Sequence, residues 1–268
     1  MRLTRSLLAA AWMFLAASPA MCAPATGGSV FVEDLTWTEL RARIAAGATT
    51  LLVPIGGTEQ NGAHMALGKH NVRARSLAEK IARSLGNALV APVIAYTPEG
   101  TIEPPTGHMR FAGTISIPVA TFEELLEATS RSFKSSGFRD IVLLGDHGGY
   151  QSSQTKVAAR LNREWKSSTV RVHALPEYYA AASVSYPRVL QGRGFTAAEI
   201  GTHAGLADTS LALAIDPKLV RADALPKAYE ATSGVYGDAR RASSELGASG
   251  IDMVVAESVA AIKRATKR

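Results

Sequence analysis

Histidine and glutamate residues gather in two polar stretches, and each stretch directly follows an apolar run. The stretch GGTEQNGAHMALGKHN carries Glu59, His64 and His70 at the end of the run TTLLVPI, while DHGGYQ carries His147 and follows RDIVLLG. Imidazole nitrogens and carboxylate oxygens are the ligands that zinc and similar divalent ions use in catalytic sites. These residues therefore predict a metal site, provided that the fold brings the two stretches together.

Five of the six histidines fall in glycine-bearing segments that we predict to be loops. They are His64, His70, His108, His147 and His203, and the sixth, His173, falls in a predicted strand. A single loop histidine is more often a hydrogen-bonded polar residue than a ligand. The concentration of several of them beside carboxylates favours a metal site over that simpler interpretation.

Cysteine contributes nothing to this chemistry. The only cysteine, Cys22, lies at the edge of a predicted leader segment, so the mature chain is expected to have none. Disulfides, thiolate ligands and a cysteine nucleophile are then excluded. A metal would have to be held by histidine nitrogen and carboxylate oxygen.

Residues 1–23 are expected to be a secretory signal peptide. Arg2 and Arg5 precede an apolar segment from Leu7 to Ala17, and small residues follow it, which is the order of such a leader. The apolar segment is shorter than the about 20 residues that a membrane-spanning helix needs. We therefore expect residues 24–268 to form a single α/β domain that is periplasmic or secreted and has no membrane association after cleavage.

The bulk composition excludes one further class of function. The formal net charge is +6, but the basic residues are scattered and no run of five or more occurs. Nucleic-acid binding therefore has no support in the sequence. The length is sufficient for one large domain with a substantial core.

Apolar runs alternate with helical patterns along the chain. The predicted strands are TTLLVPIG, NALVAPVIAY, TISIPVA, RDIVLLG and TVRVHAL. The predicted helices are DLTWTELRARIAAG, ARSLAEKIARSLG, TFEELLEATSRSFKSSG and YQSSQTKVAARLNREW. The third helix has Thr121 as its expected N-cap, Glu124 three residues later and Gly137 as its stop, which is a capping box with a glycine terminator.

Continuous apolar strands that alternate with amphipathic helices predict a three-layer αβα fold with a mostly parallel central sheet. Ligands in such folds bind beyond the carboxyl ends of the strands. Glu59 and His147 follow two of the strongest predicted strands. We therefore expect both side chains to project from the same edge of the sheet.

A long proline-rich segment, residues 96–117, is expected to form a loop over the site. His108 could line a substrate pocket there, and Glu99 or Glu103 could contact a cationic substrate. Packing of this loop against a neighbouring subunit is an equally good interpretation.

Five blocks of the sequence resemble the creatininase (creatinine amidohydrolase) family. They are PIGGTEQNGAHMALG, FAGTISI, LLGDHGGYQ, THAGLADTSLAL and GVYGDARRASSELG, and they occur in this order across nearly the whole mature chain. The resemblance implies an α/β metal-dependent hydrolase that acts on C–N bonds of cyclic amides, formamides or peptides. It also implies two divalent ions, often zinc, manganese or iron, and assembly as a homohexamer.

The resemblance assigns roles to individual residues. It implies that Glu59 and His147 bind metal and that Asp208 stands at the family's late metal-binding carboxylate. It also implies that His203 acts as general base or acid. His64 matches a histidine of the family motif.

Three positions depart from the family pattern. Asn61 stands where the family has a ligand histidine, His70 where it has a bridging aspartate, and Gly149 where creatinine hydrolase itself has a ligand glutamate. Asparagine binds metals weakly, through its carbonyl oxygen, and an imidazole normally binds one ion rather than bridging two. We therefore expect one well-held ion rather than two, zinc first, with manganese or iron as alternatives. The departures do not favour creatinine over other small-molecule amides.

The predicted site has three groups of residues. The predicted metal ligands are Glu59, His70, His147 and Asp208. The predicted catalytic residues are Glu59 and His203, the latter relaying a proton to the departing nitrogen. The predicted substrate-binding residues are His64, Asn61, His108, Gly148 and Gly149. Asp146, next to His147, is expected either to orient a ring nitrogen or to cap a helix.

Two other classes of function compete with this interpretation. A non-catalytic binding protein that retains the fold would account for Asn61 and His70, whereas the retained Glu59 and the other histidines favour an enzyme. A serine hydrolase is disfavoured because Ser152 and Ser210 lack the glycine-flanked GxSxG elbow.

Overall fold

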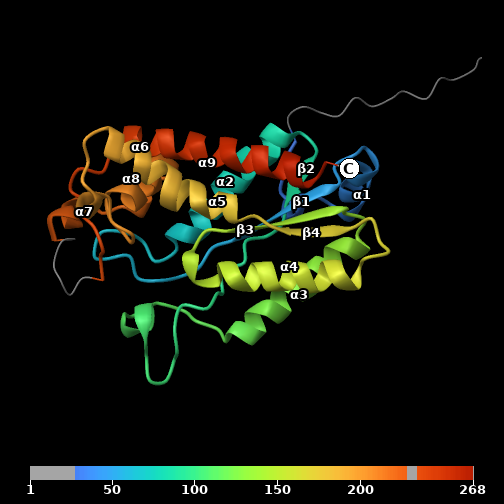
Figure 1. The fold of residues 1–268 in the computed structure, drawn as a ribbon, viewed down its shortest axis with the longest axis horizontal. Helices are drawn as coiled ribbons and strands as arrows, with labels where there is room; N and C mark the ends of the chain where they lie inside the picture. Colours follow the sequence, from blue (N-terminus) through green and yellow to red (C-terminus); the bar gives the residue numbers. More distant parts are fainter. Residues whose placement is uncertain (1–27, 228–233, 268) are drawn as a thin grey trace, which may run out of the picture.

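The computed structural model describes residues 28–227 and 234–267. The predicted signal peptide, with Cys22, lies outside these residues. Two helical layers enclose a central parallel sheet, as Figure 1 shows. The predicted three-layer α/β fold is confirmed.

The sheet of the described residues has four parallel strands in the order β2–β1–β3–β4. Their bounds are Thr50–Ile55 for β1, Ala88–Val90 for β2, Asp140–Gly145 for β3 and Arg171–Ala174 for β4. The central strands β1 and β3 are in register, and the last residue of β1, Ile55, lies opposite the last residue of β3, Gly145. The loops that follow these two strands therefore start side by side at one edge of the sheet.

Side chains of the two central strands alternate between two cores. Leu52 and Val142 belong to one core, and Leu51 and Ile141 belong to the other. Both strands are buried along their whole length. This double burial explains why each strand is a continuous apolar run and not an alternation of apolar and polar residues.

The helices cover the two faces of the sheet (Figure 1). The first face carries α2 (Lys69–Leu85), α5 (Pro176–Ala180), α6 (Tyr186–Gly192), α8 (Leu206–Ile215) and α9 (Ser244–Ala265). The second face carries α1 (Trp37–Ala45), α3 (Val119–Ser135) and α4 (Gln151–Glu164). The segments that connect these elements contain α7 (Ala197–Ile200) and a π-helical segment (Ala181–Ser185). They also contain the 3-10 helices Val32–Asp34, Gly107–Arg110, Gly148–Tyr150, Pro217–Leu219 and Ala222–Lys227.

Two helices begin earlier than their sequence patterns predict. α2 begins at Lys69, so His70 lies in its first turn and not in a loop. α3 begins after Pro118, which places Thr121 inside the helix, so the predicted capping box is wrong. Gly137 ends this region with φ +104°, a left-handed conformation that glycine adopts without steric cost, as its predicted role requires.

The predicted strand TISIPVA is wrong, because residues 114–118 form no strand. The backbone N–H groups of Ile115 and Ile117 donate instead to the carbonyl oxygens of Thr58 and Thr97. The Ile115 bond fastens the long connection between β2 and α3 to the loop after β1, and the Ile117 bond joins two parts of the connection itself. The connection includes the 3-10 helix with His108 and thereby brings this histidine to the carboxyl edge of the sheet.

Among the described helices, none combines the length and the apolar character that crossing a bilayer requires.

Candidate metal centre

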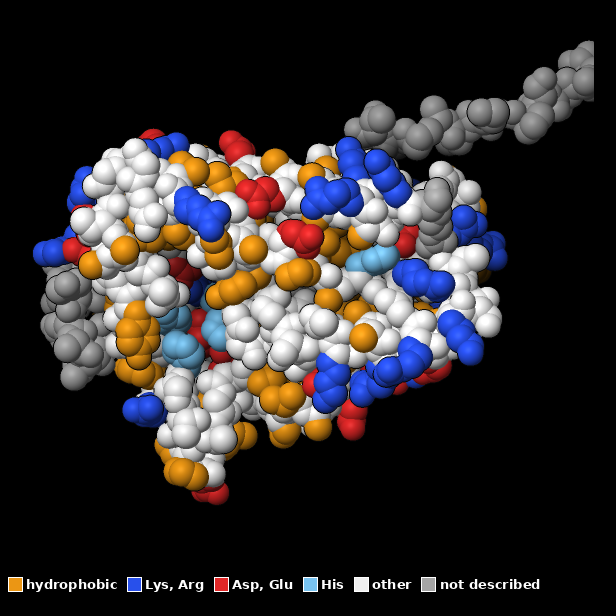
Figure 2. All heavy atoms as spheres, viewed as in Figure 1, with side chains coloured by type: hydrophobic (Ala, Val, Ile, Leu, Met, Phe, Trp, Pro, Cys, Tyr) orange, Lys and Arg blue, Asp and Glu red, His pale blue; other side chains and the backbone are white. Residues whose placement is uncertain are grey.

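The loops after β1 and β3 are joined at the carboxyl edge of the sheet. The Tyr150 hydroxyl lies 2.6 Å from the carbonyl oxygen of Gly56, and the backbone N–H of Asp146 donates to the end of β1. Histidine and carboxylate side chains line a hollow on the face that Figure 2 shows. The predicted approach of Glu59 and His147 is found, since Glu59 Oε2 lies 3.6 Å from His147 Nε2.

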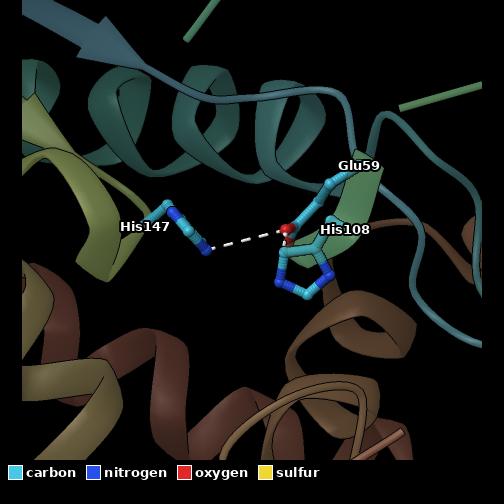
Figure 3. Close-up of side chains that lie close together, drawn as sticks. All are labelled: Glu59, His108 and His147. Carbon is cyan, nitrogen blue, oxygen red and sulfur yellow. Dashed lines mark ion pairs between the residues drawn. The ribbon is translucent and has the colours of Figure 1, made fainter. Parts of the chain in front are cut away.

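A third residue, His108, completes a group of metal-ligand type. His108 Nε2 lies 3.2 Å from the same oxygen, Glu59 Oε2. The ligand atoms of Glu59, His108 and His147 all lie within 4.8 Å of one another. Figure 3 shows the three side chains pointing toward a common centre from three separate segments.

The separations of Glu59 Oε2 from the two imidazole nitrogens suit a divalent ion. Ligands at about 2.0–2.1 Å from a tetrahedral zinc ion are separated by about 3.3 Å. The two measured separations, 3.2 and 3.6 Å, bracket that value. Glu59 Oε2 is also buried and has no hydrogen-bond partner, and a bound cation would satisfy it.

Charge at Glu59 is stabilised by its neighbours. Burial by itself would raise the pKa of this carboxyl, but the hydrogen bond with His70 and the nearby charges of His70 and Lys69 lower the pKa well below its usual value. Its other oxygen, Oε1, lies 2.8 Å from His70 Nε2. Glu59 is therefore an anion at neutral pH, as a metal ligand must be.

The ring of His147 is neutral because it is buried. Burial lowers its pKa to about 4, although the Glu59 charge works against this shift. The two glycines that follow make room for aromatic neighbours: a Cβ at Gly148 would lie 2.7 Å from the Tyr179 hydroxyl, and one at Gly149 would lie 3.1 Å from the His147 ring. Both glycines thus shape the site, and contact with substrate stays a prediction for them.

His70 lies next to Glu59 but is fully engaged with protein groups. Its Nε2 contacts Glu59, and its Nδ1 lies 2.6 Å from Asp146 Oδ2. Arg73 and the Tyr178 hydroxyl also donate to the Asp146 carboxylate. Asp146 therefore orients a histidine, but the histidine is His70 and not the adjacent His147. With both ring nitrogens used, His70 is not part of the three-residue group, and its predicted ligation of metal stays a prediction.

Asp208 is held by cations from α2. It forms ion pairs with Lys69 and Arg73, and the backbone N–H of Ala204 donates to it. Burial would raise the pKa of this carboxyl, but the two cations lower it well below its usual value. Asp208 is thus neutralised by protein groups, and it too stands outside the three-residue group, so its metal-binding role also stays a prediction.

His203 faces the same hollow from the segment before α8. Its Nε2 donates to the carbonyl oxygen of Gln60 at 3.0 Å, and its Nδ1 lies 3.7 Å from Glu59 Oε1. Burial and the Lys69 charge lower its pKa to about 3. The ring is therefore neutral, with Nδ1 turned toward Glu59, and its predicted catalytic role stays a prediction.

Asn61 and His64 serve the conformation of the loop after β1. The Asn61 amide donates to the carbonyl oxygens of Glu59 and Ala66, and His64 Nε2 lies 3.0 Å from the Thr209 hydroxyl. Both residues are fully buried. Neither lines the cavity of about 170 Å³ beside the metal-ligand group, and their predicted contact with substrate stays a prediction.

Two basic residues that no sequence motif singled out line that cavity. Lys69 and Arg73 line it together with His147, His203 and Tyr179. A signal was present in the sequence, because GKHNVR places three basic side chains at the start of a helix. Cations are unfavourable at a helix N-terminus, so such a cluster indicates that acidic partners or a functional site lie opposite.

Glu99 supplies a second carboxylate beside the metal-ligand group. Its Oε2 is buried without a hydrogen-bond partner and lies 3.6 Å from His147 Nδ1. Burial and the nearby Glu59 charge raise the pKa of Glu99 to about 7. The predicted contact of Glu99 with a cationic substrate stays a prediction, whereas its contact with the metal-ligand group is a finding.

The chain is similar to known creatininases along most of its length. The family model for creatinine amidohydrolase matches residues 33–262. Creatinine amidohydrolase of Pseudomonas putida is 32% identical over 200 residues, which are 73% of this chain and 75% of that protein. A mycofactocin precursor peptide peptidase of Mycolicibacterium smegmatis is 30% identical over 180 residues, which are 65% of this chain and 61% of that protein.

Solved structures agree with these sequence relationships. A crystal structure of creatinine amidohydrolase has a TM-score of 0.75 at 27% identity and covers 90% of this chain and 100% of its own. Similar creatininase structures include a mutant of Zn-Zn type and a Mn form. The fold and the carboxylate–histidine group thus define a metal-dependent amidohydrolase. The chain belongs to the creatininase family, as its five sequence blocks predicted.

Proposed function

We propose that this protein is an exported hydrolase that cleaves the C–N bond of an amide or cyclic amide with one divalent ion held by Glu59, His108 and His147. The observation that carries the proposal is the unpartnered, buried Glu59 Oε2 with an imidazole nitrogen at 3.2 Å and another at 3.6 Å. Two nitrogen ligands and one carboxylate with an open position are typical of catalytic zinc. Zinc is accordingly our first choice.

One ion is favoured over two by the surroundings of the group. His70 uses both ring nitrogens on Glu59 and Asp146, and Asp208 is paired with Lys69 and Arg73. Within the described ranges, a single group of at least three histidine, cysteine or acidic residues meets the spacing of a metal site. A second ion would have to displace existing ion pairs.

The residues around the group suit hydrolysis of an amide. A divalent ion bound here would polarise the substrate carbonyl and lower the pKa of an attacking water. His203 contacts Gln60 through Nε2, which lies 3.0 Å from the carbonyl oxygen and 3.2 Å from the side-chain amide nitrogen of that residue, and its Nδ1 is directed toward Glu59. Burial and the Lys69 charge lower its pKa to about 3, so the ring is neutral before substrate binds, and it would accept a proton and pass it to the departing nitrogen.

Metal content and turnover test this proposal directly. Purified protein should bind one equivalent of zinc per chain in equilibrium dialysis with elemental analysis. Metal-loaded protein should hydrolyse at least one member of a panel of creatinine, other cyclic amides, formamides and short peptides, and a chelator should abolish that activity. Metal uptake without turnover, or no uptake at all, would favour a non-catalytic binding protein instead.

Export and assembly are further parts of the proposal. The basic, apolar and small-residue order of residues 1–23 supports a periplasmic or secreted location, which cell fractionation tests. Homo-oligomers, hexamers in particular, are expected from the family resemblance, and light scattering of the purified protein tests this.

A further inference from the structure

Two buried carboxylate oxygens flank the imidazole of His147, one at each ring nitrogen. Glu59 Oε2 lies 3.6 Å from Nε2, and Glu99 Oε2 lies 3.6 Å from Nδ1. Both glutamate side chains are completely buried. In the part of the chain that the structure describes, these two are the only carboxylate oxygens that are buried without a hydrogen-bond partner.

The position of the Glu99 carboxylate is fixed by its own segment and by the loop after β1. The Thr97 hydroxyl donates to Glu99 Oε1 at 2.8 Å, and the Glu99 backbone N–H donates to the Ser116 hydroxyl at 3.0 Å. A Cβ at Gly57 would lie 2.7 Å from Glu99 Oε1, so the absence of a side chain there makes room for the carboxylate. One oxygen is thus anchored, and the other is left facing His147.

Ligation of a metal through Nε2 places the remaining ring proton of His147 on Nδ1. A buried N–H needs an acceptor, and metal-ligating histidines usually donate this proton to a carboxylate, a carbonyl or a water. The Gly149 backbone N–H lies 3.2 Å from the same nitrogen and can donate only when Nδ1 carries no proton. Gly149 and Glu99 therefore select opposite tautomers, and ligation at Nε2 requires the one that Glu99 accepts.

We propose that Glu99 is a positioning residue that accepts the Nδ1 proton of His147 and so fixes this imidazole for binding metal through Nε2. The inference rests on the proposed metal site. It accounts for both unpartnered carboxylate oxygens at once, because the cation satisfies Glu59 Oε2 and the imidazole satisfies Glu99 Oε2. It also gives the segment 97–116 a second function besides supplying His108.

The test compares zinc binding by wild type, Glu99→Gln, Glu99→Leu and a control, Glu103→Gln, which changes an exposed glutamate on the same segment. Zinc affinity is measured by competition with a chromophoric chelator, and the His147 tautomer is read from ¹⁵N NMR shifts of the zinc-loaded protein. We expect Glu99→Gln to weaken zinc binding about 10- to 100-fold, Glu99→Leu to weaken it further, and the control to behave as wild type. Stoichiometry should not change, and the Nδ1–H signal of His147 should shift or be lost to exchange in both Glu99 variants.

Three results would overturn the inference. Unchanged affinity and an unchanged His147 signal in both variants would show that Glu99 does not position this ring. Loss of a zinc equivalent in Glu99→Gln would show that Glu99 is itself a ligand. No zinc binding by the wild type would overturn the proposed function and this inference together, whereas the first two results leave the proposed function intact. Thermal unfolding of each metal-free variant verifies that a lost affinity does not reflect a lost fold.

Discussion

Replacing His108 with alanine distinguishes the ligand set of the structure from the one that the sequence predicted. The sequence assigned His108 to substrate binding and His70 to metal, whereas the structure places His108 Nε2 3.2 Å from Glu59 Oε2. Four-ligand zinc peptides bind with about 10–16 kcal/mol, so one ligand contributes about 2.5–4 kcal/mol. The expected loss for His108→Ala is therefore roughly 100- to 1,000-fold in Kd.

The fold should tolerate this change. The His108 side chain is 21% exposed on a 3-10 helix, and within the described residues its Nδ1 has the Gln60 amide as its one hydrogen-bond partner. Loss of one such bond costs about 1 kcal/mol. A much larger loss of metal affinity than of stability is thus expected, and both are measurable on one preparation by chelator competition and urea unfolding.

His173→Ala is the matched control for this experiment. His173 is also a partly buried histidine with an acidic partner, Asp140 at 2.9 Å, but it lies on β4 and pairs with the first residue of β3, at the opposite end of that strand from the site. Its removal should leave zinc affinity unchanged. Wild-type affinity in His108→Ala, or an equal loss in His173→Ala, would refute the assignment of His108 as a ligand.

The other expected outcomes concern the groups around the ligands. His70→Ala leaves the buried carboxylates of Glu59 and Asp146 without their shared partner, so the free energy of unfolding of the metal-free protein should fall by about 3–5 kcal/mol; a loss under 1 kcal/mol in urea unfolding would contradict this. Lys69→Met should also destabilise the protein, because Asp208 keeps only Arg73 as a cationic partner; if the melting temperature stays unchanged, the pair is not needed for folding. The pKa of His203 is about 3 in the folded chain and 6.5 in the unfolded chain. Between these two pH values the unfolded state binds more protons, so the free energy of unfolding falls as the pH falls through this window. His203→Gln should reduce this acid sensitivity and, in turnover assays, lower kcat about 10²- to 10⁴-fold. Acid sensitivity equal to that of the wild type would contradict the buried neutral state of His203. Full activity would contradict its proton-transfer role.

Much of the architecture was predictable because its determinants are local. β1 and β3 are buried on both faces, so their sequences are continuous apolar runs, and parallel strands that carry helices between them must end at a common edge. The placement of Glu59 and His147 beside each other follows from that topology alone. Gly137 likewise ends α3 as predicted, since a left-handed backbone conformation is a local requirement.

The predictions that failed depended on contacts with distant residues. Residues 114–118 have the composition of a strand, but their N–H groups bond to the loop after β1 and to Thr97 instead of to a neighbouring strand. α2 extends back to Lys69 because the three basic residues among its first five find acidic partners in Asp146 and Asp208. Helix propensity alone would not favour cations at that end.

The sequence by itself determined the fold class, the family and the pairing of Glu59 with His147 at the edge of the sheet. Only the tertiary structure decided which histidine joins them, and it brings in His108 from a proline-rich connection while α2 engages His70 with Asp146. The physical reason is that periodicity and capping act over a few neighbouring residues, whereas ligation depends on distances between atoms of segments that only the packed core brings together.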